Sequence, residues 1–417
     1  MFFMDFRVAL RRLVRSDQRA FSIGALATIG VAVAALTLIL QLANAVLWAP
    51  LPFADADAVV ELSERNLGRQ LPRYSVSTPN FQSWQIALSE HADLAATQFA
   101  NPTLSRDGER PATRVIGFHG SHNLWRVLGI PLLAGRSFDA EHQKPGATPV
   151  VILSKKLWQT RFANDPTVIG RTIGIDEVQY TVLGIAPNDV GFSDQVDLWL
   201  PLQETNNNRG DRRLTVWARL RAHVTLASMQ SALTTVSTQL AAQFPQDNVG
   251  WDAIAQSARA AIVGADVRAR VWMLLIAVVI MLLLACANIA NLQIARAFGQ
   301  AGDQAVRYSL GSSRWGLLRL PLVESLLLGA IGASIGLAVA SISIGVVAAN
   351  APTSVPRLAA MRFDVGIGFY AFATTCLLMV LCGAIPAWLS LRQSTSGSLR
   401  SARSTGALAP LRQGLLV

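Results

Sequence analysis

This chain is short of the residues that most enzymes and metal proteins need. Of its 417 residues only 15% are charged, three are cysteines and five are histidines. All three cysteines, Cys286, Cys376 and Cys382, fall inside apolar runs, so neither a disulfide framework nor a zinc site is indicated. The histidines are scattered, and only His119 and His122 form a close pair, which favours surface or structural roles over metal binding.

The sequence also lacks a phosphate-binding loop. No segment matches G-x-x-x-x-G-K-[ST], the glycine-rich turn whose backbone amides hold nucleotide phosphates. The chain therefore cannot hydrolyse ATP by itself in the usual way, and energy, if it is used, must come from another protein. We expect no enzyme activity, no cofactor and no bound metal.

Apolar sequence, in contrast, is abundant, because 52% of the residues are hydrophobic. The long apolar runs cover residues 21–48, 271–298, 320–347 and 365–391. Each is at least as long as the roughly 20 residues that a helix needs to cross a bilayer. We therefore predict four transmembrane helices. The first would be about 42 Å long at 1.5 Å per residue, which implies tilt or a protruding outer end.

The N-terminus has two interpretations. Residues 1–20 mix aromatic and aliphatic side chains with arginines, which is typical of an amphipathic segment on a cytoplasmic membrane surface. A cleaved signal peptide is the alternative, since Ala43-Asn44-Ala45 has the form of a cleavage site. The apolar run is nearly twice the upper limit of about 15 residues for a signal, so an uncleaved helix is favoured.

The net charge of +10 fits a membrane topology better than nucleic-acid binding, because single arginines flank the apolar runs. They gather at residues 7–19, 296–319 and 392–412, which the positive-inside rule places in the cytoplasm. We predict a multi-pass protein of a bacterial inner membrane with both termini cytoplasmic. Residues 50–267 and the short loop 348–364 then face outward, and residues 392–417 form a cytoplasmic tail.

The segment 50–267 has the patterns of a folded mixed α+β domain. Residues 213–221 alternate as a strand with one buried face that carries Leu214 and Val216, while Trp217 falls on the other face. Thr225 can cap an amphipathic helix that Phe244-Pro245 closes. Earlier, residues 149–153 are a buried strand with Ser154 as the cap of a short helix, and residues 172–175 and 179–185 form a hairpin.

The loop between the second and third runs, residues 299–319, is the first candidate site. Residues 301–310 can form a short helix that Gly311 ends. The segment is either a contact site that is accessible from the cytoplasm or an ordinary loop whose arginines set topology. Its candidate contact residues are Gln304, Val306, Arg307, Leu310, Gly311 and Arg314.

Polar and small residues within the runs are the second candidate site. Asn288 and Asn291 lie near the inner end of the second helix, and Glu324 lies near the start of the third. An ionisable residue at that depth is a functional candidate, although snorkelling or a hydrogen bond to a neighbouring helix explains it equally well. Gly332 and Gly336 have the G-x-x-x-G spacing that lets a helix of the same chain, or of a second copy, approach closely.

Several strings resemble a known family. LLLACANIANLQIARA, AVRYSLGSSRWGLLRLPLVESLLLGAIGASIGLAVA and CGAIPAWLSLR resemble the FtsX-like permease domain of MacB-type ABC transporters. STPNFQSWQ, WRVLGIPLLAGRSF, PGATPVVILSKKLWQTRFANDPTVIGRTI, YTVLGIAPNDVGF and DLWLPL resemble the MacB-like periplasmic core domain. The resemblance covers nearly the whole chain. It implies a four-helix membrane unit, a large periplasmic domain and a coupling helix at residues 301–312 that meets an ATPase.

The resemblance also implies partners and alternatives. Four helices are half of an eight-helix transporter, so a dimer with itself or a similar half is expected, with an ABC ATPase and a periplasmic adaptor as further partners. Family members carry a charged run before the coupling helix that Ala301 to Arg307 lacks, which puts docking strength in doubt. The terminal LRQGLLV resembles the start of a second repeat in duplicated members. The alternative functions are a non-transporting, FtsX-like regulator of a periplasmic enzyme and an orphan membrane-anchored binding protein.

Overall fold

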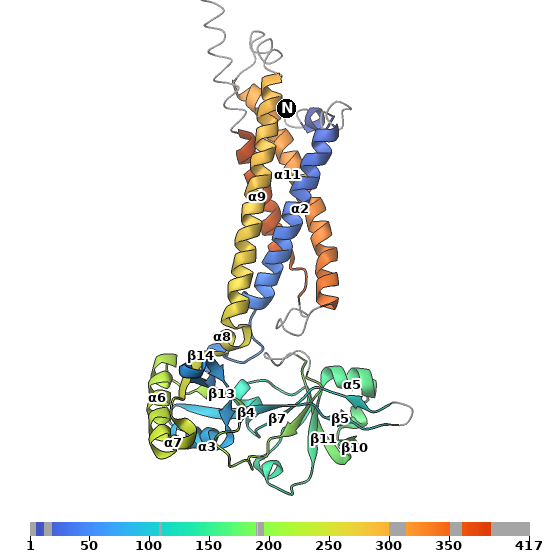
Figure 1. Cartoon of the computed structure of the whole chain (residues 1–417). Coiled ribbons are helices and arrows are strands. Elements are labelled where there is room, and N and C mark those ends of the chain that lie inside the picture. Colours follow the sequence, from blue (N-terminus) through green and yellow to red (C-terminus); the bar gives the residue numbers. More distant parts are fainter. Residues whose placement is uncertain are drawn as a thin grey trace, which may run out of the picture. The chain divides into compact units, whose positions relative to one another are not determined.

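The computed structural model describes residues 6–11, 19–107, 111–188, 190, 196–299, 314–350 and 361–384. The chain divides into two compact units (Figure 1). One, here called the helical unit, comprises residues 1–45, 268–351 and 358–417. The other, here called the extramembrane domain, comprises residues 46–267 and 352–357.

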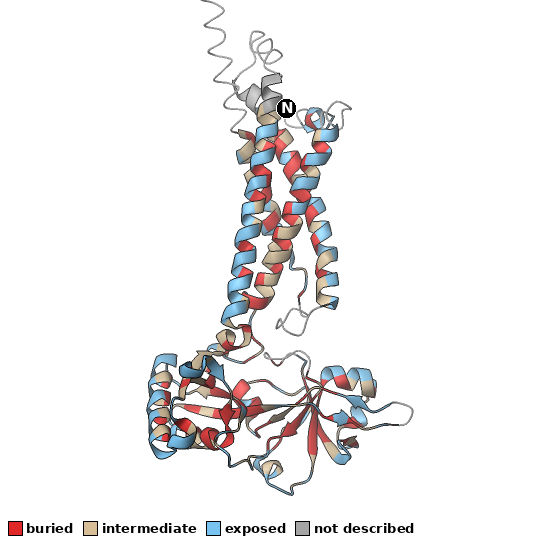
Figure 2. Cartoon of the chain, in the orientation of Figure 1, coloured by how far each residue is buried: buried red, intermediate tan, exposed pale blue. Residues whose placement is uncertain are grey.

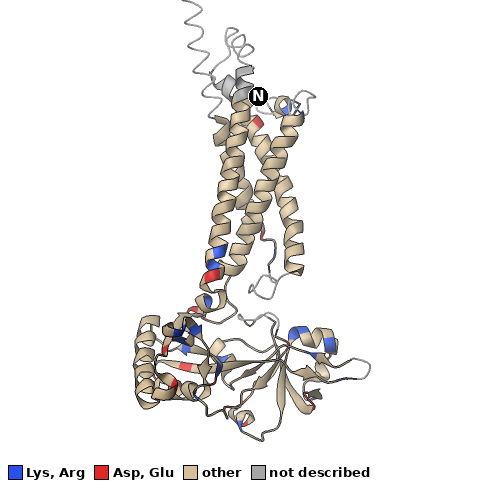
Figure 3. Ribbon diagram, in the orientation of Figure 1, with Lys and Arg blue, Asp and Glu red and all other residues tan. Residues whose placement is uncertain are grey.

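The described residues include four helices that are long and apolar enough to cross a membrane. They are α2 (Arg19–Ala43), which continues into a π-helical turn η1 (Asn44–Trp48), α9 (Ala265–Gly299), α11 (Arg314–Ala349) and the helix Val365–Ala384. Charged side chains are rare along these helices, whereas the extramembrane domain carries both signs (Figure 3). The prediction of four apolar helices around a mixed α+β domain is confirmed.

At three ends the helix bounds differ from the predicted ones by five or six residues. The helix α9 begins at Ala265 and α11 at Arg314, each six residues before the predicted start. The physical reason is that apolar runs mark only the part of a helix that lipid can cover, and charged residues continue the same helix into water. The helix α2 ends at Ala43, and the π-helical turn completes the run to Trp48.

The extramembrane domain is built on one large mixed sheet. Its strand order is β14-β1-β13-β4-β7-β12-β9-β11-β10-β5-β6, with β2, β3 and β8 paired beside this path. The pairs β9–β11 and β7–β12 are parallel, and the remaining pairs are antiparallel. The strands are β1 (Val59–Asn66), β2 (Leu71–Tyr74), β3 (Val76–Ser77), β4 (Ala92–Ala100), β5 (Thr103–Leu104), β6 (Thr113–Arg114), β7 (Gly117–Gly120), β8 (Ala134–Gly135), β9 (Val150–Ser154), β10 (Thr172–Ile175), β11 (Val178–Ala186), β12 (Leu198–Pro201), β13 (Arg212–Leu220) and β14 (Asp252–Ser257).

Short helices cover this sheet. They are α3 (Thr78–Ala87), α4 (Leu124–Leu128), α5 (Lys155–Phe162), α6 (Leu226–Gln243), α7 (Pro245–Asn248) and α8 (Ala258–Val263). The Thr225 hydroxyl accepts from the Ser228 amide and caps α6, and Ser154 caps α5 in the same way, as predicted. The predicted hairpin is also present as β10 and β11, with Ile175 opposite Val178.

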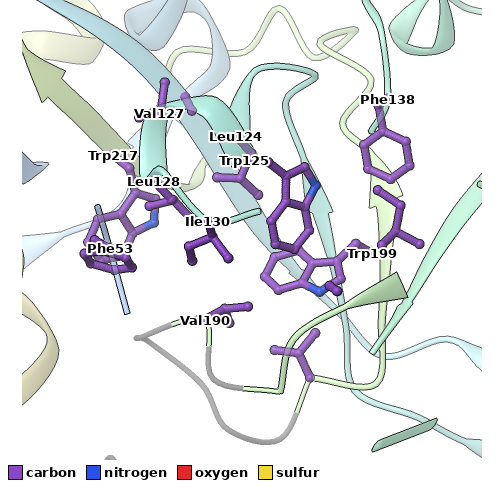
Figure 4. Close-up of a cluster of buried hydrophobic side chains, with 14 of the residues drawn as sticks. Phe53, Leu124, Trp125, Val127, Leu128, Ile130, Phe138, Val190, Trp199 and Trp217 are labelled. Carbon is purple, nitrogen blue, oxygen red and sulfur yellow. The ribbon is translucent and has the colours of Figure 1, made fainter. Parts of the chain in front are cut away.

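The prediction that β13 has one buried face is wrong. Its Leu214 and Val216 pack in the core under α3 and α6, but Trp217 on the opposite face is also buried, 2% exposed. There Trp217 meets Phe53 edge-to-face in a second core that also contains Trp125 and Trp199 (Figure 4). Alternation predicts one solvated face only when one side of the sheet is covered. In this domain both faces of the central strands are buried (Figure 2).

Candidate coupling site

The predicted coupling segment falls outside the described residues. Gln304, Val306, Arg307, Leu310 and Gly311 are therefore left as predictions, and Arg314 is the first residue of α11. The two helices that flank the segment are described. The helix α9 ends at Gly299 and α11 begins at Arg314, so the segment connects two helices of 35 and 36 residues.

The helix α9 is longer than a membrane crossing requires. Its 35 residues correspond to about 52 Å at 1.5 Å per residue, against roughly 30 Å of hydrocarbon. The helix runs without a break from Ala265, near the end of the extramembrane domain, to Gly299.

Gly332 and Gly336 lie at the closest approach of α11 to α2. A Cβ atom at Gly332 would lie 2.7 Å from Ile29 Cγ2. One at Gly336 would lie 2.7 Å from the Gly30 carbonyl oxygen and from Val33 Cβ. Only glycine permits this spacing. The G-x-x-x-G face therefore packs within one protomer, and α2 already covers it.

The polar membrane residues lie in different surroundings. Asn288 and Asn291 lie on the exposed face of α9, and Glu324 is half-buried on α11. A contact missed in the sequence lies next to Glu324, where the buried Ser325 accepts a hydrogen bond of 3.1 Å from Gln293 Nε2 of α9. The signal that could have found it is Gln293, a third amide beside Asn288 and Asn291 in the same apolar run.

A third helix joins the same contact. A Cβ atom at Gly383, on the helix Val365–Ala384, would lie 2.0 Å from Ser325 Oγ, so the backbone of that helix lies against the serine. The Ser325 hydroxyl in turn donates to the carbonyl of Pro321, four residues earlier on α11, at 2.8 Å. Three apolar helices therefore meet at one satisfied polar group.

The point where the chain enters and leaves the extramembrane domain is also held by side chains. Arg259, half-buried on α8, donates from Nη1 to the carbonyl of Leu47 at 2.9 Å and to that of Ala49 at 3.0 Å. Leu47 lies in the π-helical turn that follows α2, and Ala49 comes directly after this turn. Because α8 is followed by Gly264 and then α9, one arginine joins the arriving chain to the departing chain.

Side-chain hydrogen bonds of another arginine connect the helix α8 to the sheet. Arg73 of β2 donates from Nη1 to the Ala261 carbonyl at 2.9 Å, and its Nε donates to Glu61 Oε1 of β1 at 2.9 Å. Glu61 is 3% exposed, and this burial raises the pKa of its carboxyl against the opposing effect of Arg73. The chain of contacts Glu61–Arg73–α8–Arg259 is here called the junction.

A second buried ion pair lies on the other side of the sheet. Arg212 of β13 pairs with Glu64 of β1, and the two side chains are 4% and 3% exposed. Asn80 and Asn248 complete the network, with Asn80 donating to Glu64 at 2.7 Å. Burial raises the pKa of Glu64, while Arg212 acts in the opposite direction. These groups hold α3, α7 and two strands together.

No cluster of three metal-ligating side chains occurs among the residues that the structure describes. His119 is largely buried, with Nδ1 3.2 Å from the Pro201 carbonyl oxygen, and burial lowers its pKa. His122 instead contacts Gln143.

Comparison with known proteins assigns the chain to a family. Residues 22–236 match the MacB-like periplasmic core domain, and residues 275–397 match the FtsX-like permease C-terminal domain. The chain belongs to the MacB-like, FtsX-like permease family. This confirms the predicted resemblance, and the order of the two domains agrees with the described helices and sheet.

Individual relatives of the family are distant. The Macrolide export ATP-binding/permease protein MacB of Shewanella sp. (strain ANA-3) is 23% identical over 306 residues, which are 71% of this chain and 45% of that protein. MacB of Shewanella sp. (strain W3-18-1) is 26% identical over 288 residues, 68% and 42% of the two chains. The matches therefore span less than half the length of these relatives.

Two solved structures are similar to the chain at low identity. The periplasmic region of MacB from Actinobacillus actinomycetemcomitans is 12% identical, with a TM-score of 0.38, over 50% of this chain and 91% of that one. The extracellular domain of the transporter YknZ from Gram-positive bacteria is 13% identical, with a TM-score of 0.36, over 47% and 99%.

Proposed function

We propose that this permease couples ATP hydrolysis by a separate ABC ATPase to movement of its extramembrane domain, and that this movement exports a substrate. The ATPase would dock on residues 301–312. The membrane would be a bacterial inner membrane, with both termini and the docking segment in the cytoplasm and the domain in the periplasm.

The observation that carries this proposal is the unbroken course of α9. One helix connects the segment next to Gly299 with the extramembrane domain at Ala265. At that end the junction joins α8 to residues 47–49 through Arg259 and to β1 through Arg73. A force on the docking segment would therefore be transmitted along α9 to α8. From α8 it would reach the sheet through charge-assisted hydrogen bonds.

Assembly as a dimer follows from the exposed face of α9. Asn288 and Asn291 lie on this face, where lipid cannot accept or donate hydrogen bonds. A second copy that presents the same amides would satisfy them, at roughly 1 kcal/mol per contact. The Gly332–Gly336 face is a poorer candidate because α2 occupies it.

Two other functions are compatible with the same arrangement of helices and extramembrane domain. In a non-transporting regulator the movement would activate a periplasmic enzyme, and in an orphan anchored protein no ATPase would bind. Association with an ATPase separates the last function from the others. Transport of a substrate against its gradient in proteoliposomes separates export from regulation.

The docking test is the double variant Val306→Asp and Leu310→Asp, with Ser343→Ala on α11 as the control. We expect the double variant to reach normal protein levels but to lose ATPase co-purification and ATP-dependent activity, since burying charge in an interface costs a few kcal/mol. Normal association and activity in the double variant would refute the docking assignment.

A further inference from the structure

A small basic cavity lies at the far end of the sheet from the junction. It has a volume of about 220 Å³ and lies between β5, the end of α5, β10 and β11. Figure 3 shows basic residues, in blue, on α5 at this end of the domain. Its charged lining residues are Arg106, Arg161, Arg171 and Asp107.

Three arginines and one aspartate give the lining a net positive charge. Arg171 Nη2 lies 3.6 Å from Asp107 Oδ2, beyond hydrogen-bond length, and both side chains are about half exposed. Asp165 lies within electrostatic range of Arg171 as well. The Asp107 contact is therefore a loose surface ion pair, and such pairs contribute little stability. A stronger anion can displace it.

Two backbone carbonyls fix the guanidinium of Arg161. Its Nη1 donates to the Pro111 carbonyl at 3.1 Å and its Nη2 to the Ser105 carbonyl at 3.1 Å. Its Nε is buried and has no hydrogen-bond partner among the residues that the structure describes. A guanidinium fixed by two backbone carbonyls loses little entropy when it binds a ligand, and it keeps a positive charge at the cavity.

The size and charge of the cavity limit its ligand. A volume near 220 Å³ lies below the roughly 300–1,000 Å³ typical of sites for drug-sized molecules. Arginine forks match the oxygen geometry of phosphate, and several of them compensate a double negative charge. We propose that this cavity binds a phosphate or a phosphomonoester group. The proposal does not depend on coupling to an ATPase.

Binding is tested on the full chain in phosphatidylcholine nanodiscs by isothermal titration with inorganic phosphate at constant ionic strength. We expect saturable binding that weakens at least tenfold in the double variant Arg106→Ala, Arg171→Ala. The matched control is Arg126→Ala, Arg136→Ala, because it also removes two exposed arginines paired with aspartates at 3.4 and 3.5 Å. The control should bind as the unaltered chain does.

A third variant keeps the test independent of folding. Asp107→Ala removes the competing carboxylate and should tighten phosphate binding several-fold, an effect that a folding defect cannot produce. The proposal is overturned if phosphate gives no saturable heat, if the control loses as much affinity as the pocket variant, or if Asp107→Ala weakens binding.

Nanodiscs that contain phosphatidic acid distinguish two sources of the group. If a lipid headgroup occupies the cavity, added phosphate competes with it and binds more weakly in these discs than in phosphatidylcholine alone. If the source is a soluble phosphate compound, the affinity is the same in both discs, and glycerol 3-phosphate competes with inorganic phosphate. Either result supports the proposal and assigns the source.

Discussion

Replacing Arg259 tests the junction directly. The change Arg259→Met keeps an apolar stem of similar length but removes the donors to the Leu47 and Ala49 carbonyls. A hydrogen bond to a charged group contributes roughly 1.5–3 kcal/mol. Both bonds share Nη1 and the side chain is half-buried, so we expect a loss of about 2 kcal/mol rather than the sum.

For a domain of this size, a loss of about 2 kcal/mol lowers Tm by roughly 4–8 °C. Tryptophan fluorescence of the full chain can report it, because Trp84, Trp199 and Trp217 are buried in the domain. Arg126→Met is the control, since Arg126 is 69% exposed and its pair with Asp93 should contribute little. If Arg259→Met lowers Tm no more than the control does, the junction does not stabilise the extramembrane domain.

Three further predictions concern separate contacts. Burial lowers the pKa of His119, so below about pH 6.5 the unfolded chain binds more protons than the folded chain does. The free energy of unfolding should therefore fall as the pH drops from 7 through the folded-state pKa. In unfolding titrations at several pH values, His119→Gln should flatten this dependence. Gly336→Ala should lower the free energy of unfolding of the helical unit in detergent by roughly 1–3 kcal/mol. Gly345→Ala should not, because its added Cβ atom meets nothing within 4 Å. Equal effects of the two variants would contradict the close packing. Asn288→Leu with Asn291→Leu should reduce the yield of cross-linked dimer in membranes, while Ser334→Ala, whose hydroxyl bonds the Ala330 carbonyl, should leave it unchanged.

The features that could be predicted from the sequence depend on neighbouring residues. Apolar run length determined the four helices, and the caps Thr225 and Ser154 act within three residues of their own positions. The G-x-x-x-G spacing correctly indicated close helix packing, although it did not indicate that α2 is the partner.

The features that could not be predicted depend on residues far apart in the chain. Arg259 and Leu47 are 212 positions apart, so no spacing rule connects them. Trp217 is buried because α4 and the segment around Phe53 cover its face of the sheet, which a single strand's alternation cannot reveal. The phosphate cavity likewise combines arginines from three segments, each of which alone resembles an ordinary solvated charge.

Work done at residues 301–312 should move the extramembrane domain. A spin label at Glu90→Cys, in a chain whose native cysteines are replaced, measures the distance between the domains of two copies by pulsed electron resonance. With the partner ATPase bound, we predict that ATP and vanadate change this distance, and that Val306→Asp with Leu310→Asp abolishes the change. If the bound ATPase hydrolyses ATP before vanadate is added, and the distance in the label-only chain is still unchanged after trapping, residues 301–312 do not move the domain.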